Sequence, residues 1–297
     1  MFTGCITALV TPFKSNNTVD YQSLSRLIES QIAGQINGLV MCGTTGESPT
    51  LTEPEKIAIF KHAVKQVKHR IPIIAGTGSN DTEHTIRLTK KAEACGVDGV
   101  LIVTPYYNKP TQEGLYQHFK AIAKSVKLPI IIYNIPARTG VNMLPVTMAR
   151  LHKEFPKIII GVKEAAGSLD QATEIVKRCG KTFTLLSGDD SLTLPMLSIG
   201  GKGVISVIAN IVPKLMNEMT ESYFKGDTKK ANEPNQKLFP LYKTMFIETN
   251  PIPIKYAMSV LGMPSGRVRL PLTRPLVENQ RLIRQTLQQL HISKIKY

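Results

Sequence analysis

Lys163 is the residue whose type and position most strongly suggest covalent chemistry. It ends an apolar run over residues 158–162, and such a run is typical of a strand buried on both faces. Because strand side chains alternate, we expect Lys163 to share a face with Ile159 and Gly161, while Glu164 points the other way. Desolvation then disfavours the ammonium, and a neutral amine can form a Schiff base with a carbonyl. A lysine snorkelling from a strand end explains this segment equally well.

Other polar side chains follow neighbouring apolar runs. Tyr133 lies one run before Lys163, on the strand face of Ile131, and adjacent parallel strands are about 4.8 Å apart. A phenol beside a Schiff-base lysine can relay protons. Segment 43–46, Gly-Thr-Thr-Gly, offers hydroxyls for proton transfer and backbone N–H groups for a carboxylate. Taken singly, Tyr133 could fill a barrel and segment 43–46 could be an ordinary loop, but together these strand ends indicate an active site.

Eight strand-like runs alternate with amphipathic segments. This alternation predicts parallel βαβ units, and eight units close a (β/α)8 TIM barrel, whose chemistry lies at the carboxyl ends of its strands. We expect strands at 6–13, 38–43, 71–78, 99–105, 128–136, 157–165, 183–189 and 203–209. We expect helices between them at 21–34, 53–68, 82–95, 112–126, 144–154, 168–178 and 191–199. An open doubly wound sheet is the alternative, but no Gly-x-Gly-x-x-Gly opens a helix after the first run.

The strand pattern stops at residue 212. Helix-like segments follow at 213–225, 228–247, 252–261 and 276–291, with prolines between and within them. A chain of 297 residues exceeds a usual single core unless it is an α/β barrel, which commonly reaches about 250 residues. We therefore predict a catalytic barrel domain at 1–224 and a C-terminal helical region at 225–297.

Composition narrows the class of protein. The formal net charge is +15, but Lys and Arg are spread along the chain, so we expect a basic surface and not a nucleic-acid partner. Such a field would concentrate small anionic substrates. No apolar stretch approaches the ~20 residues that span a bilayer, and the amino terminus lacks a signal-peptide pattern, so we expect no membrane association. The four cysteines are widely separated, without metal-ligand spacing, which predicts buried free thiols and a cytoplasmic location.

Five motifs together resemble one family. They are Gly-Thr-Thr-Gly-Glu at 43–47, Thr-Pro-Tyr-Tyr-Asn at 104–108, Tyr-Asn-Ile-Pro-Ala-Arg-Thr-Gly at 133–140, Gly-Val-Lys-Glu at 161–164 and Leu-Ser-Gly-Asp-Asp at 186–190. With them, essentially the whole chain is similar to the dihydrodipicolinate synthase family of pyruvate-dependent lysine Schiff-base aldolases. The motif at 43–47 marks the superfamily, whereas the arginine-containing motif at 133–140 is specific to the synthase branch.

The resemblance implies a (β/α)8 lyase that acts in the diaminopimelate and lysine pathway without a metal or organic cofactor. By the resemblance, Lys163 forms an imine with pyruvate, and Tyr133 donates and accepts protons. Thr44 and Tyr107 complete a proton relay, with Tyr107 reaching in from a neighbouring subunit. The enamine derived from the imine would attack L-aspartate 4-semialdehyde, and cyclisation would then free the lysine.

The resemblance also implies the substrate contacts and the assembly. Thr45 would bind the pyruvate carboxylate, and the backbone of Ile205 would line the same pocket. Arg138 would bind the carboxylate of the second substrate, in keeping with its forked donors. Gly188 would lie close to the substrate path. The family implies a homo-oligomer, and we expect a homotetramer built as a dimer of dimers.

Feedback-inhibited members of the family bind lysine at a subunit interface. The matching positions here are Ser48, Pro49, Glu53, Lys56, Asn80, His84 and Tyr106. Inhibited bacterial members carry histidines at the positions of Glu53 and Lys56, and a glutamate at that of His84. Here Lys56 and His84 stand where the positive end of the ligand needs acceptors, although Glu53 could pair with Lys56 and soften this. We therefore expect weak or no inhibition by lysine.

Two alternatives remain. Another lyase of the superfamily, cleaving sialic acid or a 2-keto-3-deoxy sugar acid, would share Lys163 and Tyr133, but Tyr107 and segment 137–140 argue against it. A basic RNA-binding protein on the same barrel would need a clustered basic stripe with interleaved aromatic residues. The chain has no tryptophan and its charges are dispersed, which disfavours that reading.

Overall fold

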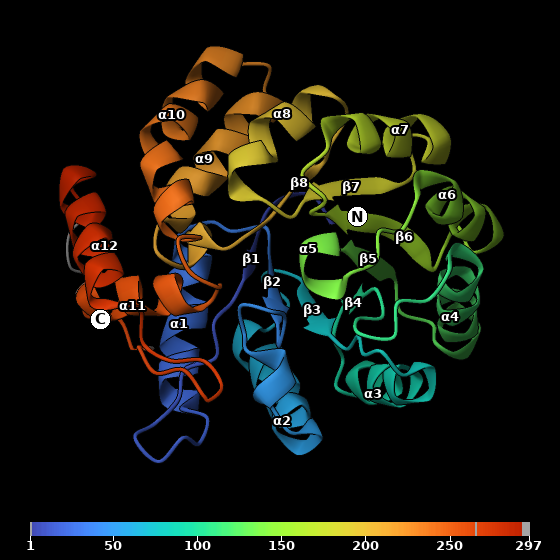
Figure 1. Cartoon of the computed structure of the whole chain (residues 1–297), viewed down its shortest axis with the longest axis horizontal. Coiled ribbons are helices and arrows are strands. Elements are labelled where there is room, and N and C mark those ends of the chain that lie inside the picture. Colours follow the sequence, from blue (N-terminus) through green and yellow to red (C-terminus); the bar gives the residue numbers. More distant parts are fainter. Residues whose placement is uncertain (1, 265, 293–297) are drawn as a thin grey trace.

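Eight parallel strands close into a barrel in chain order, and helices surround it (Figure 1). The structure, a computed structural model, describes residues 2–264 and 266–292. The strands are β1 (Gly4–Ala8), β2 (Gly38–Met41), β3 (Ile73–Gly76), β4 (Gly99–Val103), β5 (Ile130–Asn134), β6 (Ile159–Glu164), β7 (Thr184–Ser187) and β8 (Gly203–Ser206). The predicted (β/α)8 barrel is confirmed, although most strands are shorter than predicted. Apolar runs continue past the strand ends because loop residues there are buried too, as Leu9 and Val10 are.

Helices follow the strands as the alternating pattern predicts. The barrel helices are α1 (Tyr21–Ala33), α2 (Glu53–Val67), α3 (Thr82–Ala94), α4 (Gln112–Ser125), α6 (Pro145–Glu154), α7 (Leu169–Cys179), α8 (Thr193–Ser198) and α9 (Pro213–Phe224). Short turns add η1 (Ser48–Thr50), α5 (Pro136–Thr139), η2 (Asp190–Leu192) and η3 (Ile208–Asn210). Several helices begin where a side chain caps them, and Thr52 and Glu55 form a reciprocal capping box at α2. The predicted helix at 191–199 is divided between η2 and α8, and the single turn α5 was not predicted.

Apolar side chains form two layers. One fills the barrel interior and consists of Phe2, Ile6, Ala8, Val40, Ile74, Leu101, Ile131, Tyr133, Leu186 and Ile205. The other, much larger, lies between the strands and the helices and extends into the C-terminal helices. The strands are therefore buried on both faces, as continuous apolar runs predict.

Strand β6 departs from simple alternation. The register with β5 shifts, since Ile130 pairs with Ile159 whereas Ile131 pairs with Gly161. Ile159 packs in the outer layer, and the intervening residue Ile160 packs against the interior cluster. Lys163 therefore does not share a face with Ile159, contrary to the sequence prediction, because one extra residue in the strand inverts the alternation.

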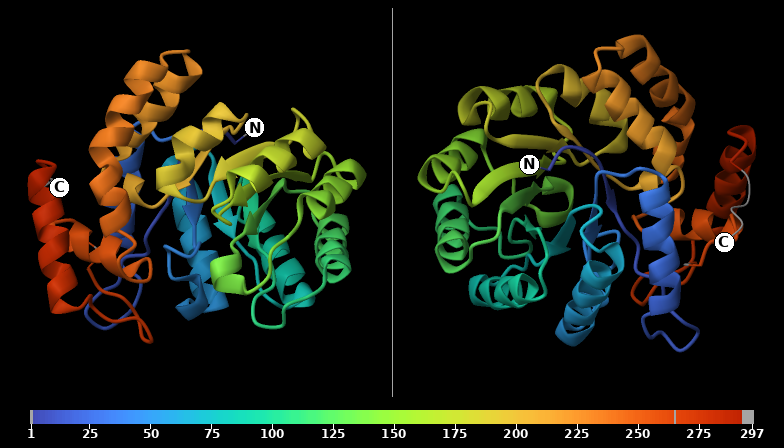
Figure 2. Two further views of the ribbon diagram at one scale, coloured as in Figure 1. Left: turned by 45° about the horizontal axis from the view of Figure 1, so that its top comes forward. Right: turned by 180° about the vertical axis from the view of Figure 1, so that it is seen from behind.

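The C-terminal helices pack against one side of the barrel (Figures 1 and 2). They are α10 (Thr228–Thr244), α11 (Ile252–Val260) and α12 (Val277–Gln289), and α12 packs on α10 and α11. Their apolar side chains, such as Leu241 and Ile254, belong to the same cluster as the outer layer of the barrel. The C-terminal helical appendage is confirmed, whereas a domain boundary at 224/225 stays a prediction. Residue 1 of the predicted barrel domain and residues 293–297 of the predicted C-terminal region lie outside the described residues.

The remaining predictions on class concern membranes and thiols. Within residues 2–264 and 266–292, no helix is long and apolar enough to cross a membrane. The four cysteines are free, and Cys5, Cys42 and Cys179 are buried as predicted. Cys95 is only half-buried, because it caps the carboxyl end of α3, where its thiol donates to the Lys91 carbonyl at 3.1 Å.

Candidate active site

Lys163 and Tyr133 lie side by side in the barrel interior. They are register partners on β6 and β5, near the carboxyl ends of both strands. Both are buried, with exposed fractions of 4% and 6%. The Lys163 Nζ lies 4.3 Å from the centroid of the Tyr133 ring. An amine and a phenol are thus held together where water has little access.

Glu164 points away from this interior. Its carboxylate accepts hydrogen bonds from the Asn134 side chain at 3.0 and 3.2 Å, from Gln171 at 3.2 Å and from the Ala166 N–H at 2.8 Å. Burial raises the pKa of Glu164, and these hydrogen bonds oppose the shift. Glu164 therefore organises the outer face of β5 and β6 and does not neutralise Lys163.

Two carboxylates to which the sequence analysis gave no role, those of Asp189 and Asp190, lie close enough to Lys163 for its charge to affect their pKa values. Burial raises the pKa of Asp189 and of Asp190, and the positive charge of Lys163 acts in the opposite direction on both. The Asp190 Oδ2 also accepts the backbone N–H groups of Val207 and Ile208, each at 3.1 Å. The surroundings of Lys163 are thus less apolar than its own strand suggests. The motif at 186–190 contained both aspartates, but β7 had to be placed beside β6 before their effect on Lys163 could be seen.

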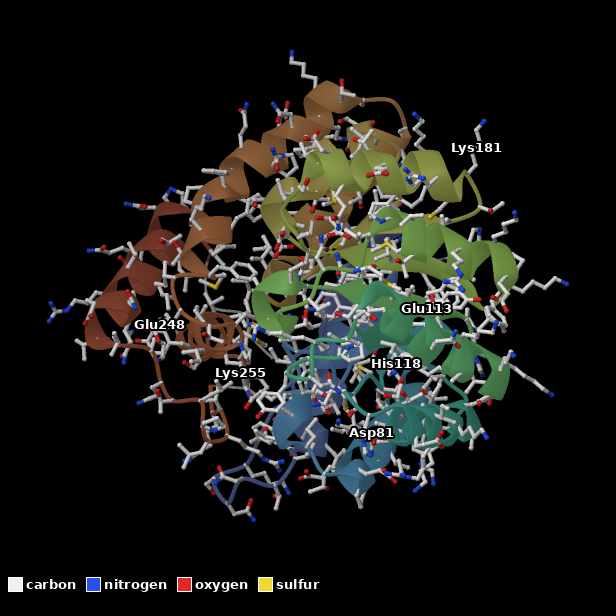
Figure 3. The ribbon with its side chains drawn as sticks, turned by 45° about the vertical axis from the view of Figure 1, so that its right-hand side comes forward. Asp81, Glu113, His118, Lys181, Glu248 and Lys255 are labelled. Atoms are coloured by element: carbon white, nitrogen blue, oxygen red, sulfur yellow. The ribbon has the colours of Figure 1, made fainter. Side chains whose placement is uncertain are left out.

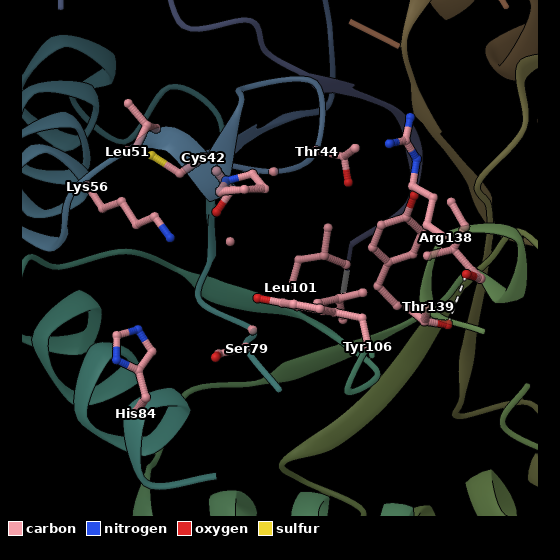
Figure 4. A pocket seen from close by; sticks show the side chains of 18 residues that line it. Cys42, Thr44, Leu51, Lys56, Ser79, His84, Leu101, Tyr106, Arg138 and Thr139 are labelled. Carbon is pink, nitrogen blue, oxygen red and sulfur yellow. Dashed lines mark hydrogen bonds between the residues drawn. The ribbon is translucent and has the colours of Figure 1, made fainter. Parts of the chain in front are cut away.

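A cavity of about 420 Å³ opens at the carboxyl ends of β2 to β5. Its polar and charged lining residues include Thr44, Ser48, Lys56, Ser79, His84, Tyr106, Tyr133 and Arg138. Figure 4 shows Thr44 and Arg138 toward one end of this cavity and Lys56 and His84 toward the other. Lys163 is not among the lining residues, whereas its register partner Tyr133 is.

Thr45 and Arg138 meet at one residue of the C-terminal region. The Asn250 Nδ2 donates to the Thr45 Oγ1 at 3.0 Å, and the Asn250 carbonyl accepts from the Arg138 guanidinium at 2.9 Å. Thr45 is buried, whereas Arg138 is exposed. Asn250 was not assigned a role from the sequence, since an asparagine before a proline carries no local signal of chemistry.

The remaining candidate residues have different environments. Ile205 is fully buried in the interior cluster. Gly188 donates its N–H to the Glu164 carbonyl at 2.7 Å, and a Cβ there would lie 2.5 Å from that of Ala165, so only glycine fits. Tyr107 does not line the cavity: its side chain is 89% exposed, and its backbone is left-handed with φ 73°.

The positions matched to lysine binding are only partly brought together. Five of them, Ser48, Pro49, Lys56, His84 and Tyr106, line the cavity, whereas Glu53 and Asn80 do not. Glu53 pairs with Lys91 at 2.5 Å and with Arg87 at 3.6 Å. The suggestion that Glu53 pairs with Lys56 is therefore wrong, because α3 supplies closer cations. Asn80 uses its carbonyl to accept from the Asn108 side chain at 2.9 Å.

Lys56 and His84 present no acceptor for an ammonium at their end of the cavity. Burial lowers the pKa of Lys56, and the negative charge of Glu53 opposes this shift. Within the described ranges, Lys56 forms no salt bridge. The His84 Nδ1 lies 2.7 Å from an Arg87 guanidinium nitrogen, so it acts as the acceptor of that hydrogen bond.

A parallel (β/α)8 barrel with a buried lysine and tyrosine paired at the carboxyl ends of its strands has the architecture of a lysine-dependent aldolase. The chain belongs to the dihydrodipicolinate synthase family, since the model of the "Dihydrodipicolinate synthetase family" matches residues 1–290. It is accordingly a lyase of the class I aldolase type.

Individual relatives agree with this assignment. A 4-hydroxy-tetrahydrodipicolinate synthase of Nitratidesulfovibrio vulgaris is 50% identical over 286 residues, which cover 96% of this chain and 97% of the relative. The crystal structure of dihydrodipicolinate synthase from Aquifex aeolicus has a TM-score of 0.97 at 47% identity, and the match covers 99% of this chain and 100% of that one. A structure described as the first monomeric dihydrodipicolinate synthase variant has a TM-score of 0.95 at 44% identity, covering 98% and 97%.

Proposed function

We propose that this enzyme condenses pyruvate with L-aspartate 4-semialdehyde, and that Lys163 carries the pyruvate as a covalent imine. It is thus a 4-hydroxy-tetrahydrodipicolinate synthase, as its relatives at about 50% identity are. The observation that carries the residue assignment is that the Lys163 Nζ lies 4.3 Å from the centroid of the Tyr133 ring inside the barrel. A buried amine beside a phenol is suited to form and hydrolyse an imine without a metal.

The first half of the reaction forms the imine and then the enamine. The Lys163 amine, once it has given up its proton, attacks C2 of pyruvate, and the resulting carbinolamine loses its hydroxyl as water after the Tyr133 phenol supplies a proton. The imine is an electron sink, so a proton leaves the methyl carbon and an enamine forms. Thr44 lines the same cavity as Tyr133, which supports a role for its hydroxyl in passing protons to and from the phenol.

The second half joins the two substrates. The enamine carbon attacks the aldehyde carbon of the second substrate, and the aldehyde oxygen takes up a proton. The amino group of that substrate then attacks C2 of the restored imine, and the C2–Lys163 bond breaks, which frees the amine and closes the ring. The protein supplies orientation and proton handling through these steps.

Substrate carboxylates are assigned to the residues joined by Asn250. We place the pyruvate carboxylate at Thr45 and the adjoining backbone, with Ile205 and Gly188 lining the path. Arg138 is exposed at the cavity, and the guanidinium donors that do not bind Asn250 can meet the carboxylate of the second substrate. The hydrogen bond from Arg138 to Asn250 supports this placement, because it holds the guanidinium close to the pyruvate side of the cavity.

The active unit is proposed to be a homo-oligomer in the cytoplasm, most simply a dimer of dimers. An 89% exposed tyrosine in a left-handed backbone supports this, since Tyr107 is poorly explained as a side chain of an isolated barrel. In a dimer, Tyr107 would enter the site of the neighbouring subunit and complete the proton relay.

Regulation by lysine is proposed to be weak or absent. Lys56 and His84 occupy the end of the cavity where a bound lysine would bring a second ammonium. Glu53, the acidic residue among the matched positions, is already paired with Lys91 and Arg87. A like charge in a partly desolvated cleft opposes such a ligand.

A turnover assay tests the proposed reaction. Pyruvate with L-aspartate 4-semialdehyde should give rapid turnover, and N-acetylneuraminate should give none at the same enzyme concentration. Turnover of N-acetylneuraminate or of a 2-keto-3-deoxy sugar acid, without turnover of the semialdehyde, would assign the chain to the other lyases of the superfamily.

A further inference from the structure

A buried ion pair joins the C-terminal helices to the loop that carries Thr44 and Thr45. The Lys255 Nζ on α11 lies 2.5 Å from the Glu47 Oε1, and the two side chains are 0% and 1% exposed. Lys255 also donates to the Thr11 carbonyl at 2.8 Å. Figure 3 shows Lys255 where the C-terminal helices face the barrel. Desolvation largely offsets the attraction within such a pair, so stability alone explains its presence poorly.

Glu47 sits at a strained end of this loop. Its φ is 58°, and that of Cys42 at the other end is 53°, so left-handed non-glycine residues flank the segment on both sides. Such conformations persist only where the surroundings over-determine them. The Glu47 N–H donates to the Thr44 carbonyl at 3.0 Å, which links the carboxylate-bearing residue directly to the threonine pair.

A second residue of the C-terminal region binds the same carboxylate. The Glu47 Oε2 accepts the backbone N–H of Arg269 at 2.9 Å, so both of its oxygens are bound by the C-terminal region. The Arg269 guanidinium in turn donates to the Thr50 carbonyl at 2.7 Å and to the Glu55 carboxylate at 2.5 and 2.9 Å. The end of the loop is therefore fastened at its side chain and at its backbone.

The beginning of the α11 segment holds the loop at another point. Asn250 donates to the Thr45 hydroxyl at 3.0 Å, and Lys255 follows one turn into the helix. The Thr11 hydroxyl donates to the Gly46 carbonyl at 2.7 Å, so the residue that accepts from Lys255 also holds the loop backbone. These contacts hold Thr45, Gly46 and Glu47, and Glu47 in turn binds the Thr44 carbonyl through its own N–H.

We propose that Lys255 and Glu47 are positioning residues that hold Thr44 and Thr45 in place for pyruvate, so that the C-terminal helices control the geometry of a site built on the barrel. This inference rests on the proposed roles of the two threonines. It requires the ion pair itself, and not merely a filled space between α11 and the loop.

The charge of Lys255 is sensitive to pH. Burial lowers its pKa to about 8, while Glu47 acts to raise it and Arg269 acts to lower it further. Above that pH the lysine loses its charge and the grip on Glu47 weakens. The ratio of kcat/KM for pyruvate in the parent to that in the double variant Lys255→Met/Glu47→Gln should therefore fall as the pH rises through about 8, without loss of folded protein. The ratio is the quantity to follow, because the proton that Lys163 must lose affects both proteins alike. A ratio that stays level or rises to pH ~9.5 would overturn the proposal.

The double variant Lys255→Met/Glu47→Gln separates positioning from stability. Lys255→Met alone leaves a buried carboxylate without its cation, which destabilises the fold, whereas removing both charges restores much of the stability. We expect the double variant to melt close to the parent and to lose roughly ten- to a hundredfold in kcat/KM for pyruvate, as small misplacements do. A folded double variant with the kcat and KM of the parent would overturn the proposal. The exposed pair Arg150 and Glu113 gives the control, since Arg150→Met/Glu113→Gln should change neither value.

Borohydride trapping distinguishes this proposal from the proposed function. Parent and double variant should both give a pyruvate adduct on Lys163, and the double variant should need about tenfold or more pyruvate for half-maximal labelling. Equal pyruvate dependence in the two proteins would overturn the positioning role. Absence of the adduct in the parent would instead overturn the assignment of Lys163.

Discussion

Tyr133 and Lys163 are register partners on adjacent strands, and the lysine Nζ lies 4.3 Å from the centroid of the tyrosine ring. The contact places the amine against the ring face, where a cation is attracted to the aromatic quadrupole. Tyr133 also lines the cavity, where a carbinolamine would need a proton. In the proposed mechanism, this one pair of side chains supplies both the nucleophile and the acid.

Lys163 should carry the covalent intermediate. Incubation with pyruvate and borohydride should add one pyruvate-derived adduct per chain, and mass spectrometry should locate it on the peptide containing Lys163. Lys163→Ala should lose nearly all turnover yet stay folded, because one side chain at a strand end is removed. Lys157→Ala, an exposed lysine just before the same strand, is the matched control and should keep full activity. An adduct on a different lysine would refute the assignment.

Tyr133→Phe should isolate the role of the phenol. The ring remains in the interior cluster, so the melting temperature should change little, whereas kcat should fall by about 10²–10⁴. Steady-state kinetics beside a thermal melt checks both expectations. An active Tyr133→Phe enzyme would show that another group supplies the proton.

Tyr107 should act across a subunit interface. Tyr107→Phe and Lys163→Ala subunits are each expected to be nearly inactive alone. Mixing them should regenerate part of the activity, since one site of a hybrid dimer then holds both intact residues. Analytical ultracentrifugation should first show at least a dimer in each protein. Hybrids that assemble and remain inactive would contradict the shared site.

Lysine should inhibit weakly or not at all. A like charge at ~4 Å costs about 4 kcal/mol at an effective dielectric near 20, which outweighs several hydrogen bonds. Initial rates at saturating substrates should therefore change little at millimolar lysine, and Lys56→Gln should become more sensitive than the parent. Half-inhibition of the parent at sub-millimolar lysine would contradict this reading, and Glu53→Ala would then test whether its carboxylate receives the ligand.

Stability should depend on pH through Lys255. Its pKa is about 8 in the fold against 10.5 when unperturbed, so between these values the unfolded chain binds more protons than the folded chain. The free energy of unfolding should therefore rise with pH across this window, by on the order of 3 kcal/mol at most from this group. Urea unfolding at several pH values should show the rise in the parent relative to Lys255→Met/Glu47→Gln. A matching pH dependence in the two proteins would exclude Lys255 as its source.

The sequence by itself determined the barrel, because eight alternations of an apolar run with an amphipathic segment leave few other ways to bury both faces of a parallel sheet. It also placed Lys163 and Tyr133 on neighbouring strands, since consecutive strands of such a barrel are adjacent. The family motifs added the identity of the reaction, which strand spacing alone does not contain.

Only the tertiary structure decided which charges meet. The extra residue in β6 changes the face of Ile159, and β7 brings Asp189 and Asp190 near Lys163. From the sequence, Glu53 could pair with Lys56 on α2 or with a cation on α3. The packing of α3 against α2 brings Lys91 to Glu53. Contacts between distant segments, such as Glu47 with Lys255, have no local sequence signal because they depend on how the C-terminal helices pack on the barrel. Periodicity predicts which elements form, whereas side-chain pairs far apart in the chain are fixed only when those elements are packed together.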